Sequence, residues 1–145
     1  MFMGEYNHTV DPKGRLIVPS KFREQLGSEF VVTKGLDGCL FVYPAEEWHN
    51  IEEKFRNISM TSKDARKFSR FFFAGAAAVE LDKQGRVLLP LNLRNYAHIT
   101  KDVMIIGVGN RLEIWDMETW DKYNSESDKS FEQLAELMGQ YGLDI

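Results

Sequence analysis

Apolar and polar positions along the chain predict strands and helices that occur in the same order twice. Short apolar runs predict strands, and apolar residues three or four positions apart predict helices. In the first half we expect strands at 7–10 and 15–18, a short helix at 20–26, a hairpin of 30–33 with 39–43, and helices from 45 to about 58 and from about 61 to 73. In the second half we expect strands at 78–81 and 86–89, a hairpin of 103–106 with 112–115, and helices from about 118 and over 127–138. This mixture indicates an α+β fold that is rich in strands.

The order recurs because the sequence itself recurs. The segment Asp11-Pro-Lys-Gly-Arg-Leu-Ile-Val-Pro19 returns 71 residues later as Asp82-Lys-Gln-Gly-Arg-Val-Leu-Leu-Pro90. The repeated positions include Asp, Gly, Arg and Pro as well as apolar residues, so the repeat has a local structural cause. A duplicated unit implies two copies of one surface, related by a pseudo-twofold axis or by stacking.

Each copy is predicted to contain a tight turn followed by an apolar strand. In the turns, 11–14 and 82–85, the Asp side chain can accept hydrogen bonds from backbone amides, and Gly accepts a positive φ. The continuous apolar run that follows favours a strand buried on both faces. Pro19 and Pro90 end these strands because proline has no N–H to donate. Ser20 is the predicted N-cap of the first short helix.

An arginine stands at the first strand position after each turn. Arg15 and Arg86 would project from a backbone held by strand pairing, with Lys13 and Lys83 inside the turns. A rigidly based guanidinium suits phosphate or guanine, both of which it can meet with two parallel hydrogen bonds. Two such loops favour a partner that is itself repetitive.

A purely structural role for these arginines is an open alternative. Arg15 and Arg86 could form ion pairs with Asp11 and Asp82 that order the turns and contact no ligand. Arg23 and Arg94, on the short helices, are weaker candidates for binding, because they could equally pair with an acid or cover apolar surface with their stems.

Charge and composition narrow the possible partners. The 145 residues carry a formal net charge of −4, which argues mildly against nucleic acid, but residues 116–145 alone carry 8 acidic and 2 basic side chains. The field near the repeated loops therefore matters more than the total. The longest uncharged apolar stretch, 71–79, is too short for a membrane helix, and the start does not resemble a signal peptide. We expect a cytoplasmic protein without a membrane partner.

The sequence offers little for catalysis. His8, His49 and His98 stand in unrelated contexts and match no metal-binding spacing. The single cysteine, Cys39, lies in a predicted strand, where a buried thiol is the simplest interpretation. We therefore expect no enzyme, no cofactor, no metal site and no small-molecule substrate.

The doubled motif resembles the MraZ family of bacterial transcriptional regulators. The pattern Asp-x-x-Gly-Arg, three apolar residues, Pro, and an Arg four positions on occurs at 11–23 and 82–94, and the resemblance covers nearly the whole chain. One copy alone would suggest only the wider AbrB-like group of swapped-hairpin proteins. The resemblance implies tandem pseudo-twofold β-barrel halves with interleaved hairpins and flanking helices, one over residues 1–74 and the other over 75–145.

The resemblance also implies a function. Members regulate the division and cell-wall gene cluster, and bind repeated boxes in double-stranded DNA upstream of their own gene as homo-oligomeric rings. This activity would place the protein at the nucleoid. The family's DNA-contacting loops correspond here to Lys13, Arg15, Lys83 and Arg86. The second copy differs from the first, since Lys83 and Gln84 replace Pro12 and Lys13.

A second class of function stays open at this point. Twin surfaces could bind protein partners in an assembly that does not involve DNA. Salt dependence separates the two classes, because a protein that contacts phosphates loses affinity steeply as salt rises.

Overall fold

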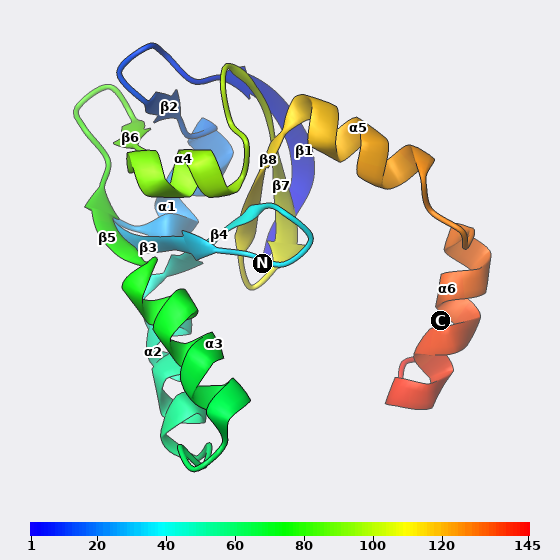
Figure 1. Cartoon of the computed structure of the whole chain (residues 1–145). Coiled ribbons are helices and arrows are strands. Elements are labelled where there is room, and N and C mark those ends of the chain that lie inside the picture. Colours follow the sequence, from blue (N-terminus) through cyan, green and yellow to red (C-terminus); the bar gives the residue numbers. More distant parts are fainter.

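The computed structural model describes residues 1–145, and its helices and strands form two matching series (Figure 1). The first series is β1 (Phe2–Thr9), β2 (Arg15–Ile17), α1 (Ser20–Leu26), β3 (Glu29–Lys34), β4 (Leu40–Pro44), α2 (Ala45–Arg56) and α3 (Lys63–Ala74). The second series is β5 (Ala77–Glu80), β6 (Arg86–Leu88), α4 (Leu91–Tyr96), β7 (Asp102–Gly109), β8 (Leu112–Asp116), α5 (Met117–Ser125) and α6 (Phe131–Met138), followed by the 3₁₀ turn η1 (Gly139–Tyr141). The α+β class expected from the sequence is confirmed.

The two halves interleave in a single antiparallel sheet. Its strand order is β1-β7-β8-β4-β3-β5, and β2 pairs with β6 in a separate two-stranded ribbon. The first strand of each half, β1 or β5, pairs with the third strand of the other half, β7 or β3. Equivalent strands pair with each other in β2–β6 and in β4–β8. Exchanging the halves therefore leaves the pairing scheme unchanged, which is the signature of a pseudo-twofold axis.

The expected closure into barrel halves is absent. Strands β1 and β5 are the two ends of the six-stranded sheet, and each pairs on one side only. The reason is that β2 and β6 pair with each other instead of joining β1 to β5. The swapped arrangement is thus an open sheet capped by the β2–β6 ribbon.

The ribbon is anchored in the core by its inner face. Leu16 and Val87 face each other across the ribbon, and each is 1% exposed. Both belong to a cluster of 19 buried residues drawn from the two halves. In this cluster Phe22 makes edge-to-face aromatic contacts with Phe2 and with the adjoining Tyr6. Burial of each Val, Leu, Ile or Phe side chain in this cluster stabilises the fold by about 1.5–3 kcal/mol.

The outer face of the ribbon is uncovered. Ile17 is 44% exposed and Leu88 is 57% exposed, so the prediction that these strands are buried on both faces is wrong. An uninterrupted apolar run is compatible with burial on one face or on two, and here no element covers the outside. This exposed apolar surface lies beside the candidate arginines.

The helix starts differ from the sequence prediction in two places. Ser20 is the first helical residue and not the cap, because Pro19 occupies the N-cap position without a capping side chain. The last helix begins at Phe131 and not near residue 127, with Ser130 as its cap. Ser62 caps α3 as expected, by accepting a hydrogen bond from the Ala65 amide.

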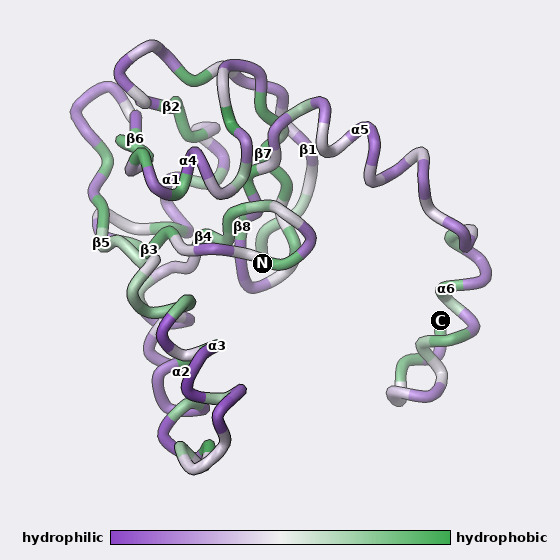
Figure 2. The backbone as a smooth tube through the Cα atoms, in the orientation of Figure 1, coloured by the Kyte–Doolittle hydropathy of each residue, from purple (hydrophilic) through white to green (hydrophobic).

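Two helical pairs extend from the body in different directions (Figure 1). Helices α2 and α3 pack against each other as an arm, with Phe55 stacked on Phe68 and Phe72. Helices α5 and α6 leave the opposite side, and no residue from Asp121 to Ile145 is buried. Green segments of α6 in Figure 2 mark apolar residues on this outlying helix. None of the helices is long and apolar enough to cross a membrane.

We propose that halves 1–74 and 75–145 cannot fold independently. A fragment of residues 1–74 retains the β3–β4 hairpin, but its β1, β2 and outer β3 edge lose their partners β7, β6 and β5. Unpaired strand edges associate with other chains. We expect the fragment to aggregate, or to dimerise in imitation of the full chain, in size-exclusion chromatography. A monomeric fragment with dispersed, sharp NMR signals would contradict this proposal.

Candidate nucleic-acid interface

The first repeated turn is built by the Asp11 carboxylate. Its Oδ1 accepts hydrogen bonds from the Lys13 and Arg15 amides, each at 2.9 Å. Its Oδ2 accepts from Arg15 Nε at 2.6 Å, and the Gly14 amide donates to the Asp11 carbonyl. Gly14 has φ +90°, a conformation that favours glycine. The turn therefore orients both the backbone and the side chain of Arg15.

The second turn repeats this geometry. Asp82 Oδ1 accepts from the Gln84 and Arg86 amides at 2.9 Å, and Oδ2 accepts from Arg86 Nε at 2.8 Å. The pKa of each Asp carboxyl lies below its ordinary value. The largest cause is the hydrogen bond from a backbone amide, that of Arg15 to Asp11 and that of Arg86 to Asp82. Both carboxyls are therefore ionised at neutral pH, and the local ion pairs considered from the sequence are present.

These ion pairs leave the two terminal nitrogens of each guanidinium available to bind a ligand. The bond to Asp uses Nε in both turns, and the terminal nitrogens of Arg15 and Arg86 make no hydrogen bond within the chain. Two terminal N–H groups are the part of arginine that binds phosphate or guanine in a forked geometry. The aspartate thus positions the arginine without occupying its ligand-binding edge.

Each loop also carries an arginine from the opposite half. Arg94 lies so close to Gly14 that a Cβ placed there would be 2.7 Å from the Arg94 Cζ, and Arg23 crowds Gly85 in the same way. The two arginines are held by bonds from Nε to the carbonyls of Leu89, at 2.9 Å, and Val18, at 2.8 Å. The antiparallel pairing of β2 with β6 therefore gives each turn an arginine side chain from the other half.

The sequence did not predict that Arg23 and Arg94 lie beside the repeated turns. Both occupy the same position in the repeated motif, and this recurrence is the one feature of the sequence that could have indicated a shared role. Their spacing from Arg15 and Arg86 could not show that each lies on the other half's turn, because only the pairing of distant strands decides which turn is adjacent.

The two loops are joined by the ribbon. The Leu89 amide donates to the Gly14 carbonyl at 2.9 Å, and the Val18 amide donates to the Gly85 carbonyl at 3.0 Å. These bonds extend the three-residue β2–β6 ladder at both ends. The turns consequently belong to one rigid unit in which a pseudo-twofold axis relates Arg15 to Arg86.

The outer face of the ribbon presents two mixed pairs of side chains. Arg15 lies opposite Leu88, and Ile17 lies opposite Arg86, while Leu16 and Val87 point into the core. Neighbouring strands are about 4.8 Å apart and alternate residues about 7 Å apart along a strand. The four outward residues therefore form a compact patch, with the arginines at diagonal corners and exposed apolar groups between them. The sequence pattern did not indicate this apolar component.

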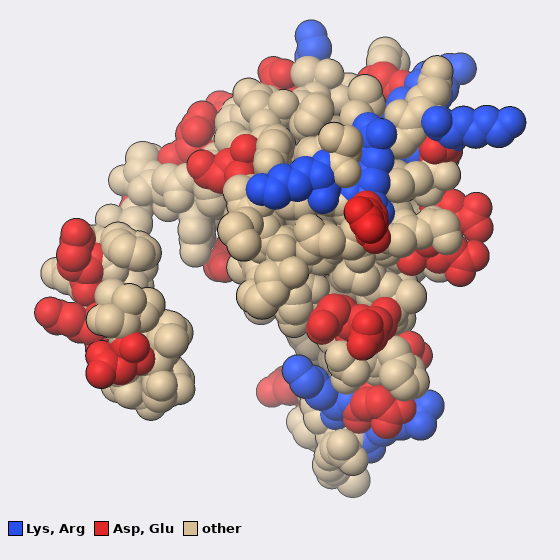
Figure 3. All heavy atoms as spheres, turned by 180° about the vertical axis from the view of Figure 1, so that it is seen from behind, with Lys and Arg blue, Asp and Glu red and all other residues tan.

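Charges are distributed unevenly over the molecule. Lys13 and Lys83 are exposed on the turns, and Figure 3 shows Lys and Arg gathered at the end of the molecule that carries the loops. The separate α6 segment in the same view carries Asp and Glu but few cations. The two turns and the arginines beside them bring six cations together, and the only acids in the turns are Asp11 and Asp82. A locally cationic end is therefore compatible with the net charge of −4.

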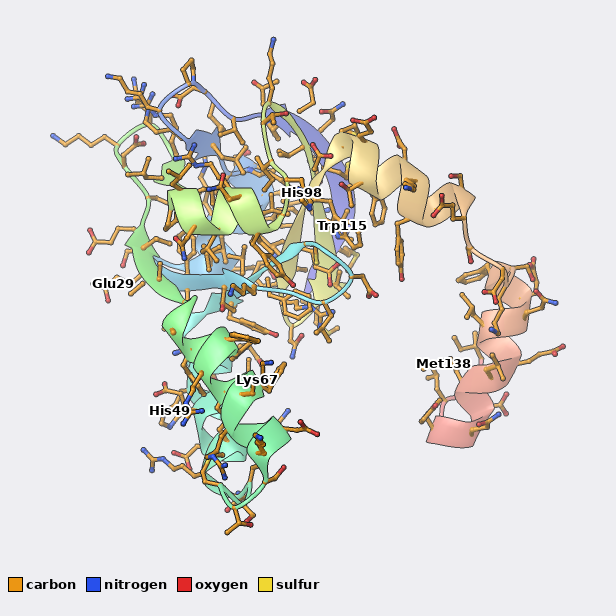
Figure 4. All side chains as sticks on the ribbon, in the orientation of Figure 1. Glu29, His49, Lys67, His98, Trp115 and Met138 are labelled. Carbon is orange, nitrogen blue, oxygen red and sulfur yellow. The ribbon has the colours of Figure 1, made fainter.

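The histidines and the cysteine do not form a second site. Figure 4 shows His49 on the arm and His98 on the body, and no group of three His, Cys, Asp or Glu residues could hold a metal ion. Cys39 is fully buried, and its thiol donates to the Leu36 carbonyl at 3.2 Å. Burial raises the pKa of this thiol to about 12, so it is protonated at neutral pH.

Comparison with known proteins finds a match to one family model over both repeats. The family model described as "MraZ protein, putative antitoxin-like" matches residues 1–71 and again residues 72–140. A protein of Thermoanaerobacter sp. (strain X514), named "Transcriptional regulator MraZ", is 60% identical over 94% of this chain and 95% of its own length. A protein of the same name from Acetivibrio thermocellus is 58% identical over 99% of this chain and 100% of its own length. The chain belongs to the MraZ family.

Proposed function

We propose that this protein is a transcriptional regulator that binds double-stranded DNA through the β2–β6 ribbon and its two turns, without catalysing a reaction. The observation that carries the proposal is the pair of aspartate-oriented arginines on one rigid ribbon, related by a pseudo-twofold axis. Relatives that are 60% and 58% identical to this chain are named transcriptional regulators, which supports the proposal.

The dimensions and chemistry of the ribbon suit the major groove. This groove is about 12 Å wide and admits a two-stranded ribbon. In such a position Arg15 and Arg86 would direct their terminal nitrogens to guanine edges or phosphates. Lys13 and Lys83, which are exposed at the turns, would contact the flanking phosphates. The Arg23 and Arg94 guanidiniums add positive charge beside the opposite turns.

The exposed apolar residues of the ribbon have a distinct role in this proposal. Ile17 and Leu88 are adjacent to the arginines and would face base edges in the groove. The thymine methyl group is the apolar feature of that surface. We therefore assign contact with thymine to Ile17 and Leu88, and contact with guanine or phosphate to the arginines.

The wider setting of this proposal is the one that the resemblance to the MraZ family implies. We propose that the targets are short repeated boxes upstream of the division and cell-wall gene cluster, and that the protein acts in the cytoplasm at the nucleoid. Each ribbon offers only a few contacts, so one subunit should bind weakly. Several subunits of a homo-oligomeric ring, engaged on spaced boxes, would raise the affinity through effective concentration.

Replacement of either turn arginine should weaken DNA binding. We expect Arg15→Ala and Arg86→Ala each to cost on the order of 1–3 kcal/mol per contacting subunit if the arginine reads a base. Binding to the chain's own upstream DNA is measured by fluorescence anisotropy at two salt concentrations. Circular dichroism and melting monitor the fold.

The matched control for this experiment is Arg56→Ala. It removes the same charge from an exposed position on the arm, where Arg56 is 73% exposed, and should leave DNA affinity unchanged. Wild-type affinity in the Arg15→Ala/Arg86→Ala double variant would refute the proposed site. Binding of the wild type that is insensitive to salt would favour a protein partner instead.

The apolar contact is tested by removing methyl groups from DNA. Uracil in place of thymine should reduce wild-type affinity by about 0.8 kcal/mol for each methyl group buried. The Ile17→Ser/Leu88→Ser variant should bind more weakly than wild type and respond less to this replacement, with its salt dependence unchanged. Val108→Ser, at an exposed position of β7, serves as the control. An equal response to uracil in wild type and variant would exclude the assigned role.

Multivalent binding is tested by the spacing of the boxes. DNA presents the same face every 10–10.5 base pairs, so a shift of about five base pairs should cost more affinity than a full-turn shift. Gel shift with two-box DNA measures this difference, and a one-box duplex is the reference. A monomer at micromolar concentration that binds one box as tightly as an array would contradict the multivalent model.

A further inference from the structure

The C-terminal helix has an apolar stripe that the chain leaves uncovered. Phe131 is 80% exposed, and Leu134, Leu137 and Met138 are between 37% and 46% exposed. The helix is nevertheless well defined at its start, where Ser130 and Gln133 form a capping box. An eight-residue helix is marginal in water by itself, and an amphipathic helix gains stability by burying its apolar face.

The equivalent helix of the first half is covered within its own half. There α3 packs on α2 through Phe68 and Phe72, which stack on Phe55 at ring-centroid distances of 6.0 and 5.7 Å. When α2 and α5 are aligned on the tryptophan that both carry, Phe55 corresponds to Ser127, beyond the end of α5. Helix α5 therefore lacks the aromatic residue that would hold α6 as α2 holds α3.

The same arm carries an open apolar pocket. The pocket has a volume of about 540 Å³ and lies between the β3–β4 hairpin, the α2–α3 arm and Tyr96 of α4. Phe68 and Phe71 on its α3 side are 48% and 54% exposed. Such surface is costly to leave in water, so the pocket is suited to an apolar occupant.

The charges of α6 and the pocket are opposite. Lys34 and Lys54 are the charged residues of the pocket lining. Lys34 Nζ lies 5.2 Å from the Phe71 ring centroid, at the edge of the apolar surface. The segment 130–145 contains Glu132, Glu136 and Asp144 but no Lys or Arg. An acidic helix with an apolar stripe thus complements an apolar pocket with a lysine rim.

We propose that α6 of one copy of this chain docks in the α2–α3 pocket of a second copy. Leu134, Leu137 and Met138 would enter the pocket, and Glu132 and Glu136 would lie near its lysines. This inference rests on the homo-oligomer of the proposed function and identifies the contact that builds it. Figure 1 shows α6 and the arm on different sides of the body, which favours a second copy over the same chain as the source of the helix.

The proposed contact has consequences for assembly. A helix of one subunit in a pocket of the next is a heterologous contact, and its repetition closes a ring or extends a filament. The arm and the ribbon lie at opposite ends of the body (Figure 1), so docking would leave the DNA-binding face free.

Two variants separate the two sides of the contact. Leu134→Asp/Leu137→Asp disrupts the helix side, and Phe68→Asp/Phe71→Asp disrupts the pocket side, and all four residues are partly exposed. In sedimentation without DNA, we expect each variant to fall from an oligomer to the 16.8 kDa monomer. An equimolar mixture should form dimers and no larger species, because each pair retains one intact helix and one intact pocket. Ile58→Asp, an exposed change on the arm outside the pocket, is the control and should remain oligomeric.

Cross-linking tests the contact in an intact oligomer. A Leu137→Cys chain mixed with a Phe71→Cys chain should give a disulfide-linked dimer that neither chain forms alone. Variants that keep the wild-type mass, or a wild type that is monomeric, would overturn the proposal. So would a cross-link found only within a doubly substituted chain, or a bound lipid-like molecule in the pocket with no cross-link between copies.

The outcome can be distinguished from failure of DNA binding. Affinity for a single box measures the ribbon alone and should be unchanged in the helix and pocket variants. Loss of cross-linking with intact single-box binding rejects the docking contact only, whereas cross-linking without DNA binding rejects the DNA proposal only.

Discussion

The pairing of β2 with β6 is the interaction on which the rest of the structure depends. The ladder has only three residues in each strand, and the Leu89–Gly14 and Val18–Gly85 hydrogen bonds lengthen it at both ends. It joins equivalent segments of the two repeats around a pseudo-twofold axis. Because Leu16 and Val87 anchor it in the common core, the two turns become one rigid body and not two separate loops. A ligand that contacts one turn therefore has the other turn at a fixed position beside it.

The ribbon explains how an acidic protein can present a cationic surface. Each Asp lowers the local positive charge, but it accepts from Nε and leaves the terminal nitrogens of its arginine unpaired. The ion pair and a ligand-binding role are therefore compatible. Arg23 and Arg94 cross to the opposite turns and add charge there, while acidic residues are concentrated beyond β8. Separation of charge along the molecule, more than its total, determines which end attracts an anion.

The symmetry of the ribbon does not extend to the helices. One half forms a packed arm with an apolar pocket, and the other half ends in a helix without a partner. The difference can be traced to the position at which the first half has Phe55 and the second half has Ser127. In the proposed function, a duplicated chain that differs between its halves in this way would present a symmetric surface to DNA and two different surfaces to neighbouring copies. Such unlike surfaces are what a head-to-tail assembly requires.

The sequence by itself determined the features that depend on near neighbours. Asp11 and Arg15 are four residues apart, so their hydrogen bonds, the glycine turn and the succession of strands and helices could be predicted from spacing. Only the tertiary structure decided the exposure of Ile17, the open sheet and the placement of Arg94 on the first turn. These features are set by contacts between strands about 70 residues apart, and a local pattern carries no information about which side of a strand a distant segment will cover.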